Sequence, residues 1–556
     1  MKIAIAQINP IIGDFKYNCH KIKEYAARAM DLDCDLVVFS ELVISGYPPR
    51  DLLERKEFVD ANIEHLNKLI NSIKGIGLIC GFSDYSLCKN GNPLYNSAAL
   101  FENGKLLYKA HKRLLPTYDV FDERRYFQPW REHSIFLYKG SRIGLTICED
   151  IWNDSSLIQK RFYQKDPVAI LVEQGADLII NISASPFVIS KKELRWNLLS
   201  SIASKYKIPL IYANQTGGND SLIFDGSSAA FDKYGQMAAR AGDFTEDLVV
   251  FDLDSQNDAE SYRDNIHPVS SSDEESVLKA LVSGTRDYVS KCGFSQAVIG
   301  LSGGIDSALT AYVAVKALGR QNVSLIFMPS EYTSKDNYED TEELAANLGI
   351  KQKIIPINGM FKEFLKYISP DFDKNNPDVT EQNLQARIRG TILMGLSNKH
   401  GSILLTTGNK SECGLGYCTL YGDMNGGLAV ISDVPKTMVY DIAKFINRDK
   451  EHIPARIIDK APSAELKDSQ TDQDDLPPYE IIDPVLKGYI EDLKSADELV
   501  KSGFDRKIVE KIIKKVTLSE YKRQQAAPGL KITSKAFGYG RRYPIAQKYY
   551  ETGVKA

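Results

Sequence analysis

Residues 297–309 read A-V-I-G-L-S-G-G-I-D-S-A-L and constrain the fold of this chain more than any other stretch. Residues 298–301 form a short run of mostly branched apolar residues, typical of a buried parallel strand. Ser302, Gly303 and Gly304 interrupt the run, and the apolar spacing becomes helical over 308–318. A strand, a glycine-rich turn and a helix N-terminus in this order direct backbone N–H groups and the positive end of the helix dipole at an anion.

An aspartate, Asp306, lies inside this predicted anion-binding turn, where its charge has the wrong sign for a phosphate. An aspartate is compatible with a phosphate site if a divalent cation is bound to the phosphates, because Mg²⁺ is held by one or two carboxylates together with substrate phosphates. Gly303 and Gly304 lack a Cβ and let the backbone approach an anion closely. Ser302 and Ser307 add hydroxyl donors. The turn therefore predicts a phosphate site that also binds Mg²⁺.

The turn is not a Walker A loop, since no G-x-x-x-x-G-K-[ST] sequence occurs in the chain. The S-G-G-I-D-S sequence resembles the pyrophosphate loop of the N-type ATP pyrophosphatases, which split ATP between its α and β phosphates and adenylate a substrate. The resemblance implies that ATP is bound by Leu301, Ser302, Gly303, Gly304, Ile305, Asp306, Ser307 and Ala308. The alternative is a glycine-rich βα turn of another α/β domain, which a match of this length between strand and helix disfavours.

The composition is that of an ordinary soluble protein, with 26% charged and 43% hydrophobic residues. A chain of 556 residues is long enough for two or more domains. The net charge of −4 argues against a general nucleic-acid-binding protein. No apolar run approaches the roughly 18 residues of a membrane span, and residues 1–10 favour a first strand over a signal peptide. The eight cysteines include no C-x-x-C pair. We therefore expect a cytoplasmic protein without membrane or nucleic-acid partners, in which a special cysteine is reactive and not disulfide-bonded.

The first half of the chain mixes β-hairpins with βα units. Asn103-Gly104 and Lys139-Gly140-Ser141 are turn sequences that predict hairpins over 97–108 and 135–147. Further strands are predicted at 2–8, 36–40, 76–82, 178–182, 209–213, 229–232 and 248–253, and a helix at 18–30. Hairpins mixed with βα units imply two packed sheets with helices outside.

Three reactive residue types lie at predicted strand ends in this half: Glu41, Lys112 and Cys148. A cysteine beside a carboxylate base and an ammonium group can attack an amide carbon. The carboxylate takes the thiol proton, and the lysine stabilises the tetrahedral oxyanion. Taken alone, Cys148 fits a buried structural cysteine better than a nucleophile.

The sequences around these three residues favour the nucleophile over the structural cysteine. L-V-V-F-S-E-L at 36–42, H-K-R-L-L-P-T-Y at 111–118 and G-L-T-I-C-E-D-I-W at 144–152 resemble the three signatures of the nitrilase superfamily. The resemblance covers about residues 1–255 and implies that Glu41 is the general base, Lys112 the oxyanion stabiliser and Cys148 the nucleophile.

The sequence P-T-Y-D-V-F-D-E-R-R-Y-F at 116–127 resembles the glutaminase branch of that superfamily. The resemblance implies that Tyr118, Ser185 and Lys191 bind glutamine. Glu123, in the same run, is either a second active-site carboxylate or a surface salt-bridge partner.

Residues 256–275 are polar and predict a linker between a domain over 1–255 and a second over 276–556. In the second half, predicted strands at 323–328, 353–357 and 402–407 alternate with helices at 276–290, 336–348 and 380–399. This order predicts a parallel sheet covered on both faces, with its ligand at the carboxyl ends of the strands. We therefore expect an α/β protein: a nitrilase-like α-β-β-α sandwich, then a doubly wound ATP pyrophosphatase domain of the adenine nucleotide alpha hydrolase-like type.

The sequence T-T-G-N-K-S-E at 406–412 follows one of these strands. We expect Thr407 to contact ATP, and Glu412 to share Mg²⁺ with Asp306, because hard oxygen donors suit a phosphate-bound ion.

Further motifs extend the resemblance over nearly the whole chain. T-E-Q-N-L-Q-A-R-I-R-G, T-T-G-N-K-S-E, S-D-V-P-K-T, and P-S-A-E-L followed by T-D-Q-D-D-L-P-P-Y resemble successive motifs of the glutamine-dependent NAD⁺ synthetases. The resemblance implies that Asn383, Glu412 and Lys535 contact deamido-NAD⁺ and that Lys436 lies near the phosphates. The substrates it implies are deamido-NAD⁺, ATP, and glutamine or ammonia, and the assembly it implies is a homo-oligomer.

Two alternatives stay open at this point. One is another glutamine amidotransferase of the ATP pyrophosphatase class, although residue 2 is Lys2 and not the N-terminal cysteine that asparagine synthetase uses. The other is a nucleotide-binding module without catalysis, which the presence of Glu41, Lys112 and Cys148 opposes. If both sites are active, ammonia must reach the second as neutral NH₃, so we expect a protected route built partly from residues 255–275.

Overall fold

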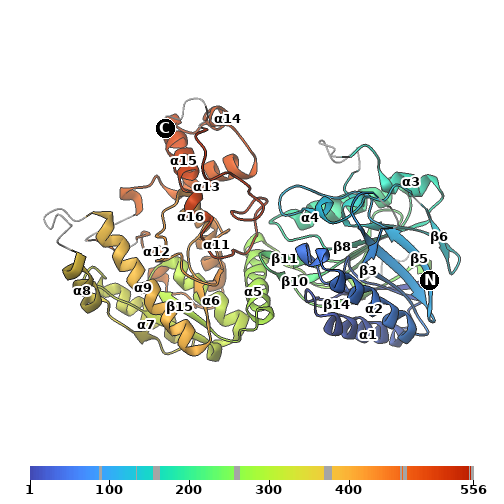
Figure 1. Ribbon diagram of the computed structural model, residues 1–556, viewed down its shortest axis with the longest axis horizontal. Helices are drawn as coiled ribbons and strands as arrows, with labels where there is room; N and C mark the ends of the chain where they lie inside the picture. Colours follow the sequence, from blue (N-terminus) through green and yellow to red (C-terminus); the bar gives the residue numbers. More distant parts are fainter. Residues whose placement is uncertain are drawn as a thin grey trace. The chain divides into compact units, whose positions relative to one another are not determined.

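The computed structural model describes residues 1–86, 90–132, 134–153, 163–255, 263–368, 378–463, 466–467, 472–549 and 551. The chain forms two compact units, Met1–Ser271 and Ser272–Ala556 (Figure 1). Part of the predicted linker, residues 256–262, lies outside the described residues. Its remainder, up to Ser271, belongs to the first unit, and helix α5 begins at Asp273.

The first unit contains two six-stranded sheets, and their facing surfaces share one apolar core that includes Ile5, Leu145 and Ile180. The first sheet has the order β14-β1-β2-β3-β4-β5, formed by β1 (Lys2–Gln7), β2 (Leu36–Val38), β3 (Gly77–Tyr85), β4 (Leu94–Glu102), β5 (Lys105–His111) and β14 (Asp247–Asp252). The second has the order β13-β12-β9-β8-β7-β6, formed by β6 (Phe136–Tyr138), β7 (Ser141–Ile147), β8 (Leu178–Ser183), β9 (Leu210–Asn214), β12 (Ala229–Phe231) and β13 (Met237–Arg240). A separate hairpin joins β10 (Thr216–Asn219) to β11 (Leu222–Asp225).

Helices cover the outer face of each sheet. Helices α1 (Phe15–Asp31) and α2 (Lys56–Ser72) pack on the first sheet, and α3 (Pro167–Glu173) and α4 (Lys191–Tyr206) pack on the second. The predicted α-β-β-α sandwich is thus confirmed. Both predicted hairpins are confirmed as well: Asn103 and Gly104, and likewise Lys139 and Gly140, all have the positive φ angles that a two-residue hairpin turn requires.

The second unit is built on a five-stranded, fully parallel sheet, as predicted. Its order is β17-β16-β15-β18-β19, formed by β15 (Ala297–Leu301), β16 (Val323–Phe327), β17 (Lys353–Ile354), β18 (Ile403–Thr406) and β19 (Leu428–Ala429). Strand order reverses between β15 and β18, and such a switch point opens a ligand crevice at the carboxyl ends of the strands.

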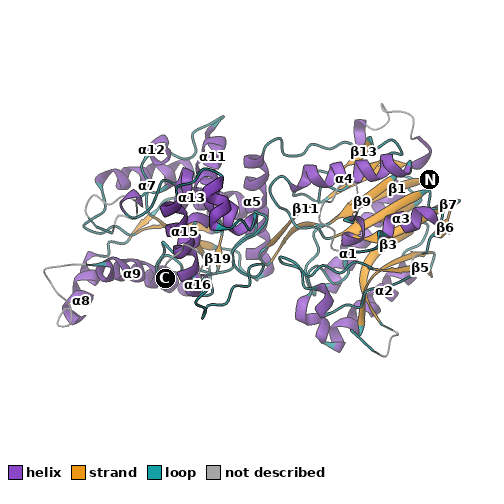
Figure 2. Ribbon diagram, turned by 90° about the horizontal axis from the view of Figure 1, so that it is seen from above, coloured by secondary structure: helices purple, strands orange, loops and turns teal. Residues whose placement is uncertain are grey.

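Helices lie on both sides of this sheet, as Figure 2 shows for α9 on one side and α7 and α11 on the other. The helices of the unit are α5 (Asp273–Lys291), α6 (Ile305–Leu318), α7 (Lys335–Asn347), α8 (Asn358–Ile368), α9 (Val379–His400), α10 (Lys410–Leu415), α11 (Lys436–Asn447), α12 (Ala455–Asp459), α13 (Tyr479–Leu486), α14 (Ala496–Lys501), α15 (Arg506–Leu518) and α16 (Glu520–Arg523). The last four, α13 to α16, follow the sheet, and α13, α14 and α15 share an apolar core that includes Ile482, Leu499 and Ile512.

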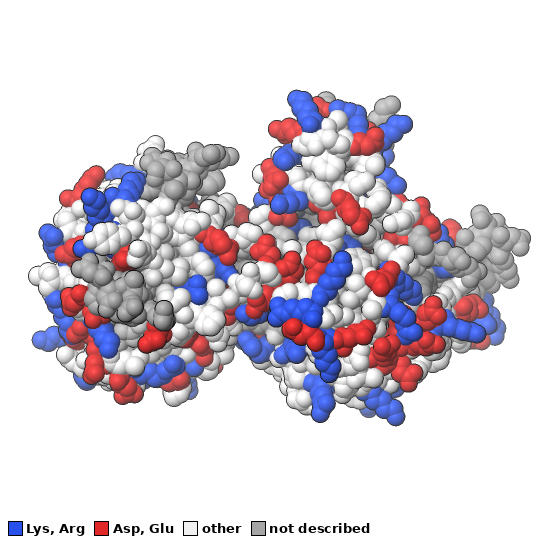
Figure 3. Space-filling model, turned by 180° about the vertical axis from the view of Figure 1, so that it is seen from behind, with Lys and Arg blue, Asp and Glu red and all other residues white. Residues whose placement is uncertain are grey.

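Charged side chains of both signs are interspersed over the face shown in Figure 3, in keeping with the small net charge of −4. Within the described ranges, no helix combines the length and the apolar character that a bilayer crossing needs.

Candidate active sites

Glu41 and Lys112 form a buried ion pair at the strand ends of the first unit. The Lys112 ammonium donates to Glu41 Oε1 at 2.8 Å, and both side chains are fully buried. The Asn96 amide donates to the same oxygen at 2.7 Å, and the backbone N–H of Ala184 donates to Glu41 Oε2 at 3.0 Å. Three donors therefore fix the carboxylate, and each of them comes from a different strand end.

Glu123 is the second carboxylate on Lys112. Its Oε1 atom accepts from the Lys112 ammonium at 2.8 Å and from the Tyr47 hydroxyl at 2.9 Å, whereas Oε2 is buried and accepts no hydrogen bond from the described residues. Burial raises the pKa of Glu123 to about 7, against the opposing effect of Lys112. The surface salt-bridge interpretation of Glu123 is wrong, because only 5% of the residue is exposed.

Cys148 follows β7 directly, as the first residue of a short 3-10 turn (Cys148–Ile151). Its φ of 46° lies in the left-handed region, which costs a residue with a Cβ on the order of 1–3 kcal/mol and is concentrated at functional sites. Burial raises the pKa of the thiol well above its usual value; the charge of Glu41 adds to the effect, and that of Lys112 opposes it. The resting thiol therefore keeps its proton and needs a base.

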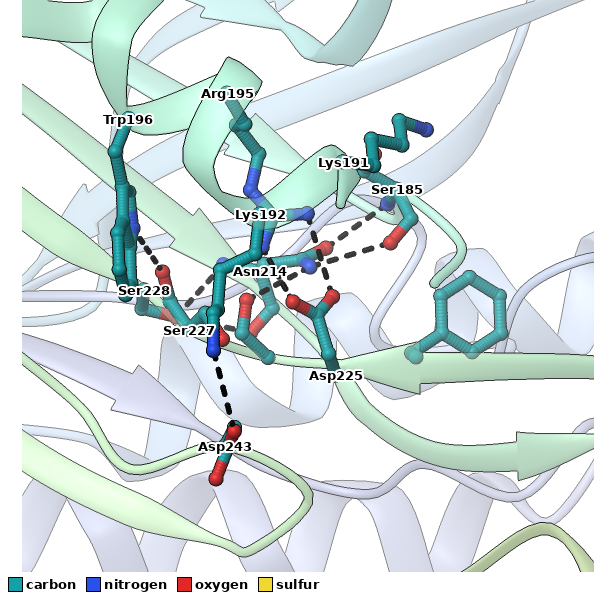
Figure 4. Close-up of polar contacts among 12 residues, drawn as sticks. Ser185, Lys191, Lys192, Arg195, Trp196, Asn214, Asp225, Ser227, Ser228 and Asp243 are labelled. Carbon is teal, nitrogen blue, oxygen red and sulfur yellow. Dashed lines mark hydrogen bonds and ion pairs between the residues drawn. The ribbon is translucent and has the colours of Figure 1, made fainter. Parts of the chain in front are cut away.

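Two of the three predicted glutamine-binding residues, Tyr118 and Lys191, interact with Glu149 in this turn. The Tyr118 hydroxyl donates to both carboxylate oxygens of Glu149, at 3.1 and 2.9 Å. Lys191, the first residue of α4, lowers the pKa of Glu149, which burial raises. Ser185 follows β8, and its backbone N–H donates to Asn214 Oδ1 at 2.9 Å (Figure 4).

Several residues of this site were not predicted from the sequence. Each of them is buried and forms a hydrogen bond to a residue singled out from the sequence or to the backbone beside one: Tyr47, Asn96, Glu149, Asp150 and Asn214. Glu149 had a usable signal, since it directly follows Cys148, the predicted nucleophile, in C-E-D. Asp150 accepts from the backbone N–H groups of Arg113 and Leu114 at 3.0 and 2.8 Å and so ties the Cys148 turn to the Lys112 segment.

The second unit has a cavity of about 270 Å³ at the carboxyl ends of β15 and β18. It is lined by seven of the predicted ATP residues from the first loop (Leu301, Ser302, Gly303, Gly304, Ile305, Asp306 and Ser307) and by Thr407. Ala308, predicted with them, is fully buried inside α6. The hydroxyl oxygens of Ser302 and Ser307 lie 3.1 Å apart, and Ser302 Oγ accepts from the backbone N–H of Gly304 at 3.1 Å. Hydrogen bonds within the loop therefore stabilise its conformation.

Gly303 has a structural reason to be glycine. Its φ is +83°, and a Cβ there would lie 2.6 Å from the side chain of Asn337, which also lines the cavity. Both the backbone conformation and the close approach exclude a larger residue.

Asp306, Glu412 and Lys436 meet on one wall of the cavity. The Lys436 ammonium forms an ion pair with Asp306 and lies 3.9 Å from Glu412 Oε1. The Asn409 amide donates to Asp306 Oδ1 at 3.0 Å and its oxygen caps α10, where Glu412 completes the capping box. Burial raises the pKa of Glu412 to about 8, and the charge of Asp306 adds to the shift.

The other residues predicted for the dinucleotide lie farther out. Asn383, on α9, accepts from the Thr419 hydroxyl at 2.8 Å, and Thr419 lines the cavity. Lys535 is not among the lining residues, and its carbonyl accepts from the Lys410 ammonium at 3.1 Å. Part of the predicted P-S-A-E-L and T-D-Q-D-D motifs, residues 464–465 and 471, lies outside the described residues.

Comparison with known proteins matches both units. The carbon-nitrogen hydrolase family model matches residues 2–263, and the NAD synthase family model matches residues 277–526. The chain is 46% identical to a glutamine-dependent NAD(+) synthetase of Synechocystis sp. and 43% identical to one of Thermotoga maritima, with 99% of each chain covered in both cases. This chain belongs to the glutamine-dependent NAD⁺ synthetase family.

A solved family structure has the same fold. The glutamine-dependent NAD⁺ synthetase of Acinetobacter baumannii, in complex with adenosine diphosphate, is 39% identical, covers 98% of both chains and superposes with a TM-score of 0.76. Members of this family are ligases that take their amide nitrogen from glutamine, and the chain has both of the domains that this requires.

Proposed function

We propose that the chain amidates the nicotinate carboxylate of deamido-NAD⁺ to NAD⁺, using ATP, with ammonia taken from glutamine. Family membership over the full chain supports the overall reaction. The observation that supports the mechanism most directly is that Asp306, Glu412 and Lys436 meet in a cavity that the proposed phosphate-binding loop also lines.

In the first unit, Cys148 is the nucleophile toward the glutamine side-chain amide. Glu41 takes the thiol proton, the sulfur attacks the amide carbon, and the Lys112 ammonium stabilises the oxyanion. Glu41 returns its proton to the leaving nitrogen, so ammonia departs and a thioester remains on Cys148. Water then attacks the thioester, with Glu41 again as base, and glutamate is released. Tyr118, Ser185 and Lys191 hold the α-amino and α-carboxylate groups of glutamine, together with Glu149.

In the second unit, the nicotinate carboxylate attacks the α-phosphorus of ATP and pyrophosphate leaves. Backbone N–H groups of residues 302–304 and the Lys436 ammonium offset the charge that accumulates on the phosphates. Ammonia then attacks the carbonyl carbon of the adenylate and expels AMP. The products are NAD⁺, AMP, pyrophosphate and glutamate.

The residues present also fit Mg²⁺. Burial raises the pKa of Glu412 to about 8, and the charge of Asp306 adds to the shift. These two carboxylates would hold Mg²⁺ together with phosphate oxygens, and the charge of the ion would offset their repulsion. Among the described residues, no group of three or more His, Cys, Asp or Glu could hold a metal by itself, so phosphate oxygens would complete the set. Bound there, Mg²⁺ would neutralise the charge of the leaving pyrophosphate.

A cytoplasmic location and a homo-oligomeric assembly belong to the same proposal. The family resemblance supports both, and the seven described cysteines, all free thiols, fit a reducing compartment.

A parallel product assay tests the function. The protein is supplied with ATP, Mg²⁺ and deamido-NAD⁺, and with either glutamine or an ammonium salt, and NAD⁺ and AMP are measured. We expect NAD⁺ and AMP in equal amounts with both nitrogen sources. Turnover of ATP to AMP that does not depend on deamido-NAD⁺ would indicate another amidotransferase of this class, and no turnover would indicate a nucleotide-binding module.

A further inference from the structure

Two buried cations lie in the first two turns of α4. Lys192 is 6% exposed and Arg195 is 1% exposed. Both lie within one helical turn of Lys191, the first residue of α4, which we place in the glutamine site. A buried charge is stable only when it is paired and hydrogen-bonded. The hydrogen-bond and ion-pair partners of these side chains therefore identify the segments that hold the N-terminal part of α4 in place.

The Arg195 guanidinium forms a two-pronged ion pair with Asp225. Nη1 lies 3.3 Å from Oδ1 and Nη2 lies 2.6 Å from Oδ2, and the two side chains are 1% and 2% exposed (Figure 4). The guanidinium also lies 5.3 Å from the centre of the Tyr212 ring on β9. A planar fork on a carboxylate fixes direction as well as distance, which a lysine cannot do.

Asp225 ends β11, and residues 225–228, which we call the corner, lead from it to β12. Gly226 and Ser227 in the corner have positive φ angles. Trp196, which follows Arg195 in α4, donates from its indole N–H to the carbonyl of Ser227 at 3.2 Å. Helix α4 is thus bound to the corner by two adjacent side chains, and the position of Lys191 one turn earlier depends on these contacts.

Asn214 connects the same corner to Ser185. Its Nδ2 atom donates to the carbonyl of Gly226 at 2.9 Å and to the carbonyl of Ser185 at 3.3 Å, while its Oδ1 accepts from the backbone N–H of Ser185 at 2.9 Å. The backbone N–H of Asn214 in turn donates to Ser228 Oγ at 3.0 Å. One amide therefore ties Ser185 to the corner with both of its polar atoms.

We infer that Arg195 and Asp225 are positioning residues for glutamine: their ion pair sets the separation of Ser185 and Lys191, two of the proposed glutamine-binding residues. This inference rests on the proposed function. Lys191 and Arg195 are one helical turn apart in α4, the Arg195 guanidinium is paired with Asp225, and Asn214 bonds to Gly226, the neighbour of Asp225, and to Ser185. The connection from Lys191 to Ser185 is therefore continuous. Neither Arg195 nor Asp225 needs to contact glutamine, because both act through the residues that they hold.

The test compares Asp225→Asn and Arg195→Lys with the wild type. Asparagine keeps the shape of Asp225 and one acceptor oxygen. Lysine keeps the charge of Arg195 but not its planar, two-pronged donor group. Both variants therefore disrupt the two-pronged ion pair while changing the size of the side chain little. Lys205→Met, at an exposed position near the end of the same helix, is the matched control. Thermal unfolding of each protein identifies a variant that does not fold.

Two electrophiles separate positioning from general damage. A glutamine-like electrophile needs the glutamine site to reach Cys148, whereas iodoacetamide does not. In both test variants we expect the ratio of the two labelling rates at Cys148 to fall by about 10- to 100-fold, as misplacement by a fraction of an ångström produces. KM for glutamine should rise more than kcat falls, and ammonia-dependent synthesis should stay within about twofold of the wild type.

An unchanged labelling ratio, or an equal loss with both electrophiles, would overturn the positioning role. The failure of the proposed function would look different: the wild type itself would then make no NAD⁺ from ammonium salt, and the labelling ratio would still report on Arg195 and Asp225.

Discussion

Lys436 forms an ion pair with Asp306 that joins the first residue of α11 to the second residue of α6. The two side chains are 2% and 17% exposed, so little water competes with the pair. Asn409 donates to the other carboxylate oxygen of Asp306 at 3.0 Å. The carboxylate is therefore held in place without a nucleotide, and we expect the Lys436 ammonium also to pair with phosphates when ATP binds.

Replacing Asp306 by asparagine should abolish synthesis with either nitrogen source. The change removes a ligand of the proposed Mg²⁺ and leaves the Lys436 ammonium without its counter-charge. We expect the rate of NAD⁺ formation to fall about 100- to 1,000-fold, the range for loss of one charge-stabilising group. Glutamine hydrolysis should persist at some level, because its residues belong to the other unit. Asp449→Asn, at a side chain that is 82% exposed, is the control, and full synthesis by Asp306→Asn would disprove the assignment.

Cys148 should be the cysteine that reacts with an electrophilic glutamine analogue. The Cys148 thiol lies within reach of the charges of Glu41 and Lys112, a carboxylate base and an ammonium group that can activate it, whereas burial is the main cause of the raised pKa of Cys80 and Cys413. Mass spectrometry of the labelled protein locates the adduct. Cys148→Ala should then lose glutamine-dependent synthesis and keep ammonia-dependent synthesis. Cys292→Ala, at an exposed thiol, is the control. An adduct on Cys413 or Cys418 would mean that the glutaminase site is misassigned.

Gly303→Ala should prevent ATP use, and Gly293→Ala should not. Both glycines have nearly the same left-handed φ, +83° and +82°, so alanine costs each about 1–2 kcal/mol of backbone strain. Only at Gly303 would the new Cβ also meet a neighbour, Asn337, at 2.6 Å, whereas nothing lies within 4 Å at Gly293. The pair of variants therefore separates strain from the close approach. Equal ATP affinities in an equilibrium binding experiment would contradict the role given to Gly303.

Local turn chemistry made much of this fold predictable. Lys139 and Gly140 specify a tight hairpin by themselves, and the S-G-G-I-D-S loop specifies a strand, a turn and a helix start. The β10–β11 hairpin was not predicted, because T-G-G-N at 216–219 is neither apolar nor alternating. Among the described strands, β10 and β11 pair only with each other. Its position depends on tertiary contacts such as the Arg195–Asp225 ion pair.

Buried charge was the least predictable property of the sites. Arg195 and Asp225 are thirty residues apart, and nothing local distinguishes them from surface charges. The basic run at 511–523 has a sequence pattern typical of a solvated helix face, but this interpretation is wrong for Arg523. That side chain is buried and donates to Glu520 Oε2 at 2.7 Å and to the carbonyl of Gly414 at 2.9 Å. Only the folded chain brings such partners together, so sequence patterns could give the catalytic residue types but not the residues that orient them.

The ligand-free protein should become less stable as pH rises toward 8, and Glu412 should be one cause. Its folded-state pKa is about 8, against 4.5 ordinarily, because burial and the charge of Asp306 disfavour its ionised form. Between these two values the folded state keeps a proton that the unfolded state has lost. The free energy of unfolding therefore falls as pH rises through this window, by up to about 1.4 kcal/mol per pH unit.

Glu412→Gln isolates this contribution, because glutamine cannot ionise and its side-chain oxygen still accepts from the backbone N–H of Asn409. Urea unfolding at several pH values between 5 and 8 should give a shallower fall for the variant than for the wild type. Glu480→Gln, at an exposed position on α13, should leave the wild-type slope unchanged. If Glu412→Gln keeps the full wild-type slope, the carboxyl of Glu412 is already ionised at pH 5, and the repulsion from Asp306 that we invoke for the Mg²⁺ site is absent.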